Sequence, residues 1–94
     1  MSDSPDMLQR LYALAEQRKS ADPETSYVAR LHAKGTSKIA QKVGEEAVET
    51  ALAAVSEGRD KVVSESADLL FHLTVLWSHL GIEPAEGMAE LARR

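Results

Sequence analysis

The stretch KIAQKVGEEAVETALAA, residues 38–54, decides the fold of this chain. Glu45, Glu46 and Glu49 stand at positions i, i+1 and i+4, so in an α-helix, which turns about 100° per residue, their carboxylates share one face. Lys38 and Lys42 fall on that same face. The rest of the helix is almost wholly apolar, whereas an ordinary surface helix has a narrow apolar stripe and a wide polar face. We therefore expect a helix that is buried nearly all round and opens only where its carboxylates point.

The composition is that of an ordinary globular chain and excludes several kinds of chemistry. The chain has 94 residues, 44% apolar and 28% charged, with a net charge of −4. With no basic block, nucleic acid is not expected as a partner, because phosphate contacts need clustered Lys and Arg. The absence of cysteine excludes disulfides, thiolate zinc sites and cysteine nucleophiles. No apolar run is long enough for a membrane span and the N-terminal MSDSPD is polar, so we expect a cytoplasmic protein without membrane contact.

Apolar periodicity and helix-end residues predict five helices and no strand. Two long helices, over about 37–57 and 60–80, are joined by a short Gly–Arg turn and must therefore pack antiparallel. The second ends at Gly81, and a last helix begins at Pro84. Both long helices are apolar around most of their circumference, in a chain too short to cover them. The predicted fold class is all-α, with residues 1–94 forming a single domain. It is a helical bundle of two long antiparallel helices plus shorter flanking helices, completed by dimerisation.

Polar residues and glycine predict where the inner helices begin and end. Ser26 is expected to cap a short helix over 27–34, and Gly35 to end it. Thr36 or Ser37 is expected to cap the first long helix, and Asp60 the second. In the last helix the apolar side chains, Met88 and Leu91, are expected to turn inward.

A second acidic pair lies on the second long helix. Glu65 and Asp68 are three residues apart and hence neighbours on one face. Both this pair and the glutamates of the first helix lie two to three turns from the interhelical turn, so they can meet at a similar height. Oxygen ligands without a soft donor suit a hard cation, Mg²⁺ or Mn²⁺. Because Mg²⁺ on a few carboxylates takes substrate phosphates as further ligands, metal-assisted phosphoanhydride hydrolysis is the predicted chemistry.

These residues also carry a resemblance to known families. The acidic pattern is similar to the signature of the all-α NTP pyrophosphohydrolases, the MazG-like superfamily. A closer resemblance, within about residues 5–82, is to the phosphoribosyl-ATP pyrophosphohydrolases of histidine biosynthesis. It is carried by Ser26-Tyr27, Gly35, KIAQKVGEEAVET (38–50) and SADLLFHLTVLW (66–77).

That resemblance implies an activity and a ligand set. The activity is the Mg²⁺-dependent splitting of phosphoribosyl-ATP into phosphoribosyl-AMP and pyrophosphate. The implied metal ligands are Glu46, Glu49, Glu65 and Asp68, with Glu45 in or beside that set.

The remaining site residues have open alternatives. Glu45 or Glu46 is predicted to act as the general base that orients the attacking water. Lys38 and Lys42 either bind substrate phosphate or are simple ion-pair partners of the glutamates one turn away. His72, one turn beyond the second acidic pair, is expected to support the metal ligands or to be a satisfied core histidine, rather than to bind the metal.

Other function classes remain in competition. A house-cleaning nucleoside triphosphate pyrophosphohydrolase would share the metal ligands. Only the residues that flank those ligands, which resemble the histidine-biosynthesis family, argue against it. A non-catalytic dimeric helical interaction module would explain the apolar helices but not the inward carboxylates. A di-iron carboxylate bundle is disfavoured because the chain has no Glu-x-x-His. The expected partners are a small-molecule nucleotide and a second copy of the chain in a homodimer. Tyr27 is expected to pack, with contact to the nucleotide as the alternative.

Overall fold

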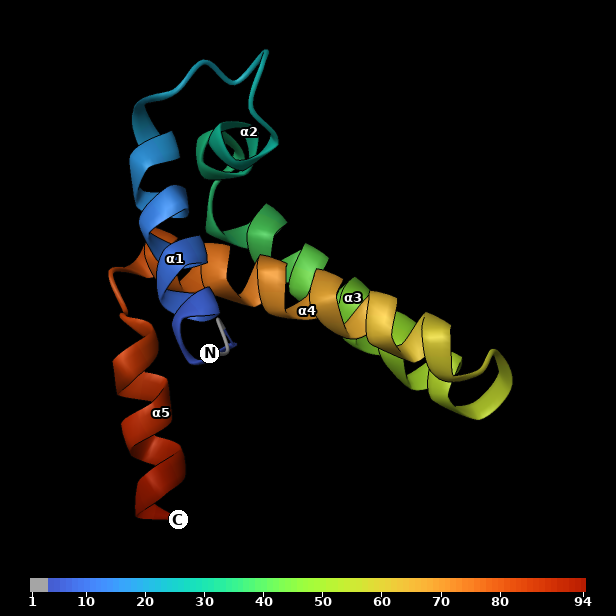
Figure 1. Ribbon diagram of the computed structural model, residues 1–94. Helices are drawn as coiled ribbons and strands as arrows, with labels where there is room; N and C mark the ends of the chain where they lie inside the picture. Colours follow the sequence, from blue (N-terminus) through green and yellow to red (C-terminus); the bar gives the residue numbers. More distant parts are fainter. Residues whose placement is uncertain (1–3) are drawn as a thin grey trace.

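The computed structural model describes residues 4–94, with side chains from residue 7 onward. These residues form five α-helices and a short 3₁₀ helix, and they contain no strand, which confirms the all-α prediction (Figure 1). The elements in chain order are α1 (Ser4–Gln17), η1 (Arg18–Ser20), α2 (Tyr27–Lys34), α3 (Thr36–Ser56), α4 (Arg59–Leu80) and α5 (Pro84–Arg93).

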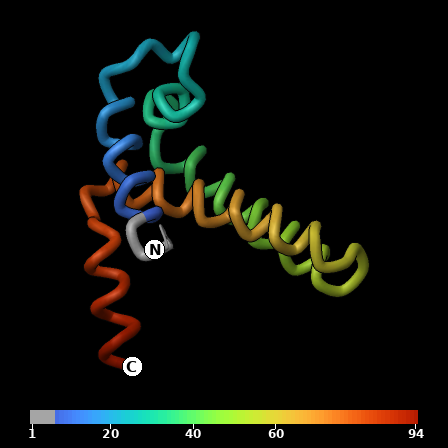
Figure 2. The backbone as a smooth tube through the Cα atoms, in the orientation of Figure 1, coloured from blue at the N-terminus to red at the C-terminus, as the bar shows by residue number. Residues whose placement is uncertain are grey.

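The two long helices, α3 and α4, form an antiparallel hairpin, as predicted. The turn between them passes through Gly58, whose φ of 100° lies in the region that favours glycine. The other helices gather at the opposite end of the hairpin, so its tip projects away from α1, α2 and α5 (Figures 1 and 2). None of the described helices is both long enough and apolar enough to cross a membrane.

The helix ends agree only in part with the predicted caps. The Ser26 hydroxyl accepts a hydrogen bond from the Ala29 N–H at 3.1 Å, as predicted. The prediction of Thr36 or Ser37 as a cap was wrong, because Gly35, with φ 94°, ends α2 and also precedes the first residue of α3. The prediction of Asp60 as a cap was also wrong. Asp60 lies within the first turn of α4, where its charge favours the positive end of the helix dipole.

The apolar core lies where α1, α2, α3 and α4 meet. Its fully or almost fully buried members come from all four helices, and half-buried Phe71 and Leu76 pack against them. This core fixes the base of the hairpin and the place of α2 over it. The core residues are Ala15, Val28, Leu31, Ile39 and Val75.

The expectation that α3 is buried nearly all round was wrong for the single chain. Val48 is 59% exposed and Val55 80% exposed, because toward the tip only α4 covers α3. On α4, Val63 and Leu70 are exposed as well. The inward placement of the apolar residues of α5 was also wrong, since both of those named above are exposed.

Candidate functional site

Three carboxylates from the two long helices meet in the middle of the hairpin. Oxygen atoms of Glu46 and Glu49 on α3 and of Glu65 on α4 all lie within 4.8 Å of one another. Glu46 and Glu65 are each only 7% exposed, whereas Glu49 lies at the open edge. The helical period places Glu46 and Glu49 on one face, and the antiparallel hairpin brings Glu65 opposite them. We refer to these three residues as the carboxylate cluster.

Two oxygens of the carboxylate cluster are buried without a partner. Glu46 Oε1 and Glu65 Oε1 accept no hydrogen bond from any described residue. The second oxygen of each carboxylate faces a lysine instead: Lys42 Nζ lies 3.8 Å from Glu46 Oε2, and Lys61 Nζ lies 3.4 Å from Glu65 Oε2. A buried charged oxygen without a partner is strongly disfavoured. The donor set therefore fits a hard cation bound between the two helices, which would satisfy both oxygens.

The charges of the cluster shift the pKa of its exposed member. The negative charge of Glu46 raises the pKa of Glu49 above its usual value, and partial burial and Glu65 add to that shift. Like charges at this separation disfavour ionisation, and a cation placed among them would reverse the effect.

Glu45 lies beside the cluster in a different environment. Gln41 donates a hydrogen bond to its Oε2 at 2.9 Å, and Lys42 lies 3.3 Å from its Oε1. Both interactions lower the pKa of Glu45, the Gln41 bond contributing most. The same ion pair raises the pKa of Lys42. In this arrangement Glu45 is better suited to accept a hydrogen bond from a water molecule than to keep a proton.

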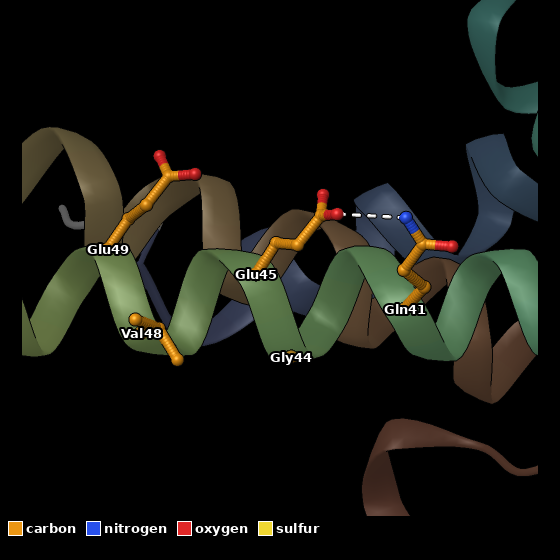
Figure 3. Close-up of a pocket in the computed structure, with 5 residues that line it drawn as sticks. All are labelled: Gln41, Gly44, Glu45, Val48 and Glu49. Carbon is orange, nitrogen blue, oxygen red and sulfur yellow. Dashed lines mark hydrogen bonds between the residues drawn. The ribbon is translucent and has the colours of Figure 1, made fainter.

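A shallow, open groove runs along the exposed side of α3 beside these residues (Figure 3). Glu45 and Glu49 point to the same side of the helix, with Gln41 reaching back to Glu45. No atom would contact a Cβ added at Gly44, so nothing in the single chain requires glycine there. Glycine within a helix costs about 1 kcal/mol relative to alanine, and no contact of the single chain compensates for that cost at Gly44. The lining residues are Gln41, Gly44, Glu45, Val48 and Glu49.

Two of the predicted site residues do not join the cluster. The carboxylate of Asp68 is exposed and lies outside the group defined by Glu46, Glu49 and Glu65. Lys38 is half-buried, and no described carboxylate lies within ion-pair distance of it. Their roles as ligand and phosphate-binding residue remain predictions.

His72 is a buried histidine with both ring nitrogens engaged. Its Nδ1 lies 2.8 Å from the backbone oxygen of Asp68, and its Nε2 lies 2.8 Å from the Tyr27 hydroxyl. This arrangement matches the interpretation of a satisfied core histidine beside the acidic pair.

The sequence patterns did not single out Lys61 as a site residue, although its position four residues before Glu65 predicts an ion pair. Tyr27 was predicted to pack, with contact to the nucleotide as the alternative. It packs against Phe71 and is still 40% exposed. The pairing of Tyr27 with His72 spans 45 positions in the sequence, so no local pattern could reveal it.

A helical hairpin that joins carboxylates from two helices around buried, unpartnered oxygens defines an all-α protein with a candidate site for a cation. Comparison with known proteins identifies the family to which the chain belongs. Residues 8–94 match the family described as phosphoribosyl-ATP pyrophosphohydrolase. The chain belongs to this family, as its sequence motifs predicted, and membership in the MazG-like superfamily is consistent with the fold.

Individual relatives agree with the family match. The chain is 56% identical over 94 residues to the phosphoribosyl-ATP pyrophosphatase of Paramagnetospirillum magneticum, covering 100% of this chain and 86% of the relative. It is 59% identical over 88 residues to the protein of that name from Azospirillum brasilense, covering 94% and 79%. For the Rhodospirillum rubrum protein of that name, the identity is 50% over 90 residues, covering 96% and 77%.

Proposed function

We propose that this chain hydrolyses phosphoribosyl-ATP to phosphoribosyl-AMP and pyrophosphate, an early step of histidine biosynthesis, in a Mg²⁺-dependent reaction. The names of its relatives support the substrate. The observation that carries the metal dependence is the pair of buried oxygens, Glu46 Oε1 and Glu65 Oε1, which accept no hydrogen bond. A non-catalytic helical module would have no use for two such oxygens buried within a hairpin.

The residues that would hold the cation come from both helices. Glu46, Glu49 and Glu65 form the cluster, and we propose Asp68, one turn beyond Glu65, as the fourth ligand. Mg²⁺ bound there would neutralise phosphate charge and stabilise the charge that develops during cleavage. Mn²⁺ has similar ligand preferences and is expected to substitute.

The ion pairs of two lysines with cluster glutamates support a role for these lysines in binding phosphate. Lys42 lies toward α2 and Lys61 toward the tip of the hairpin, each within ion-pair distance of a cluster glutamate. A polyphosphate lying along the cluster would have one ammonium group near each end. We propose that these two lysines, with Lys38 one turn before Lys42, bind the substrate phosphates and the departing pyrophosphate.

The bond change is a displacement at the α-phosphorus. A water oxygen attacks this atom in line, the bond to the α–β bridging oxygen breaks, and pyrophosphate takes the bonding electrons. The water proton passes to a carboxylate. We propose that Glu45 orients this water through its exposed carboxylate, with Glu46 as the alternative.

A homodimer would cover the apolar residues that the single chain leaves open. Val48, Leu52 and Val55 on α3 and Val63 and Leu70 on α4 are all exposed. Val48, Leu52 and Val55 share one side of α3 by the helical repeat, and a patch of exposed apolar side chains marks an interaction site. We propose that a second copy of the chain covers it, which would also explain the glycine at position 44.

The deciding experiment is incubation with phosphoribosyl-ATP, in parallel with ATP, dGTP and dUTP, followed by chromatography of the products. Phosphoribosyl-AMP and pyrophosphate should form from the first substrate and little from the others. Preferential cleavage of an ordinary triphosphate would support the house-cleaning alternative. Absence of cleavage of all four with Mg²⁺ or Mn²⁺ would contradict both.

A further inference from the structure

We propose that Tyr27 positions the sugar of the substrate: its hydroxyl oxygen accepts a hydrogen bond from a ribose hydroxyl while its own proton is held by His72. This inference rests on the proposed function. It concerns how the protein binds the sugar, the part of the substrate that is joined to the scissile phosphate.

The direction of the Tyr27–His72 hydrogen bond follows from the partners of the imidazole ring. His72 Nδ1 lies 2.8 Å from the backbone oxygen of Asp68, and a carbonyl can only accept, so Nδ1 carries a proton. In the neutral ring Nε2 is then the acceptor, and the Tyr27 O–H donates to it across 2.8 Å. The Tyr27 oxygen thus directs its proton toward buried His72 and keeps its lone pairs for another donor.

The aromatic ring of Tyr27 is held by contacts with neighbouring side chains but remains partly exposed to solvent. It packs against Phe71, with centroids 6.1 Å apart, and meets His72 edge-on. The guanidinium of Arg30 lies 5.6 Å from the ring centroid and is itself held by a 2.7 Å hydrogen bond to the Pro23 backbone oxygen. Despite these contacts, 40% of Tyr27 remains exposed. A side chain held this firmly and left this open is suited to binding a ligand.

Tyr27 lies at one end of the carboxylate cluster. His72 follows Glu65 by seven residues on α4, two turns toward the base of the hairpin, and Lys42 precedes Glu46 by one turn on α3 in the same direction. At the other end the hairpin tip projects free of other helices (Figure 1). Among the described helices of one chain, a substrate bound at the cluster therefore meets a third helix at the end where Tyr27 lies.

The chemistry of the Tyr27 oxygen selects the part of the substrate that it binds. Its remaining hydrogen-bonding capacity is to accept, so it cannot bind ionised phosphate oxygens, which also only accept. Ribose hydroxyls are donors, and the ribose is joined directly to the α-phosphate. It is thus the donor-bearing group nearest to a phosphate held at the cluster and Lys42.

The test compares Tyr27→Phe with Tyr12→Phe, which removes the hydroxyl of the only other tyrosine in the chain. Turnover of phosphoribosyl-ATP is measured for each protein, together with inhibition by inorganic tripolyphosphate, which has no sugar. Tyr27→Phe should raise KM about three- to tenfold, the range expected for one neutral hydrogen bond. The kcat and the tripolyphosphate inhibition constant should stay within about twofold, and Tyr12→Phe should match the wild type.

The other outcomes separate this inference from the proposed function. No turnover by the wild type overturns the proposed function and, with it, this inference. Wild-type turnover with an unchanged KM for Tyr27→Phe overturns the role of Tyr27 alone. Parallel weakening of tripolyphosphate binding assigns Tyr27 to structure and also overturns it. Should Tyr27→Phe fail to fold, His72→Leu serves instead: it leaves the phenol in place without its anchor, and an unchanged KM contradicts the proposal.

Discussion

The imidazole rings of His32 on α2 and His79 on α4 face one another, with their Nδ1 atoms 3.0 Å apart. The other nitrogen of His32, Nε2, lies 3.0 Å from the backbone oxygen of Ala15 on α1. Since that carbonyl can only accept, Nε2 carries a proton, and in the neutral ring Nδ1 of His32 accepts from His79. One imidazole thereby links three helices, and a second proton on His32 would place two N–H groups against each other.

This arrangement predicts that stability falls on mild acidification. Burial, with a contribution from His79, lowers the pKa of His32 below its usual value of 6.5. The unfolded chain therefore binds more protons than the folded chain just below that pH, and the free energy of unfolding decreases as the pH falls through this window. Loss of one such hydrogen bond corresponds to about 1 kcal/mol. In a domain of this size that is a decrease in Tm of about 4–8 °C.

The measurement is thermal unfolding between about pH 8 and pH 6. The raised pKa of Glu49 acts with the opposite sign as the pH falls, and Glu49 is present in every variant compared, so differences between the variants do not depend on it. His32→Phe should flatten the profile. His79→Gln should retain most of the slope, because burial is the main cause of the shift and an amide N–H can still donate to His32. An equal slope in wild type and His32→Phe would assign the effect to another group.

Metal removal should abolish activity and lower stability. Excess EDTA should stop turnover, and Mg²⁺ or Mn²⁺ should restore it, because the cation provides both phosphate binding and charge stabilisation. Added Mg²⁺ should also raise the Tm of the metal-free protein, since it binds the folded cluster and satisfies Glu46 Oε1 and Glu65 Oε1. Full activity in excess chelator is incompatible with the site.

Neutralising single carboxylates should separate activity from stability. Glu49→Gln and Asp68→Asn keep shape and remove charge, and each should reduce turnover roughly 100-fold or more. Glu49→Gln also removes repulsion from Glu46, the main cause of the raised Glu49 pKa, so the metal-free variant should keep its Tm or gain slightly. Asp68→Asn should likewise keep its Tm, because that carboxylate is exposed.

Glu57→Gln, at the end of the same helix α3 and exposed, is the matched control and should behave as the wild type. Thermal unfolding without metal and pyrophosphate release with metal are measured on the same preparations. A cluster variant that melts several degrees lower but retains near-normal turnover would assign these carboxylates to structure.

Lys61 should bind phosphate and not merely pair with Glu65. Lys61→Gln should raise KM roughly 10- to 100-fold, since a hydrogen bond to a charged group contributes roughly 1.5–3 kcal/mol. Its stability should change little, because its side chain is half exposed and such pairs contribute about 0–1 kcal/mol. Steady-state kinetics together with a melting curve tests this. An unchanged KM would show that Lys61 only forms an ion pair with Glu65 and does not bind phosphate.

The exposed apolar residues of the hairpin should lie in a dimer interface. Light scattering at micromolar concentration should give a mass of at least twice 10.2 kDa. Leu52→Glu places a charge on this surface and should shift the protein toward monomer, whereas the same change at Ala13, an exposed residue of α1, should not. A folded wild-type monomer under these conditions would refute the homodimer.

The sequence by itself determined the helices, the hairpin and the meeting of three of the acidic residues, but the structure leaves the predicted ligand Asp68 outside that group. Helical periodicity is local, so the apolar pattern located all five helices, and glycine at position 81 adopts the left-handed conformation expected at a helix end. Glu46 and Glu49 share a face because of the 3.6-residue repeat, and a short turn allows only an antiparallel partner. The shared face of Glu46 and Glu49 and the antiparallel turn together place Glu65 opposite the two glutamates.

Only the tertiary structure decided which faces are covered and which distant side chains pair. The periodicity of α3 identifies an apolar face but not its partner, so it could not show that Val55 stays exposed while Ile39 is buried. The pairs Tyr27–His72 and His32–His79 span 45 and 47 positions. They form because the core around Ile39 and Val75 fixes α2 across the base of the hairpin. Such contacts depend on the relative placement of whole helices, which is a property of packing and not of any local pattern.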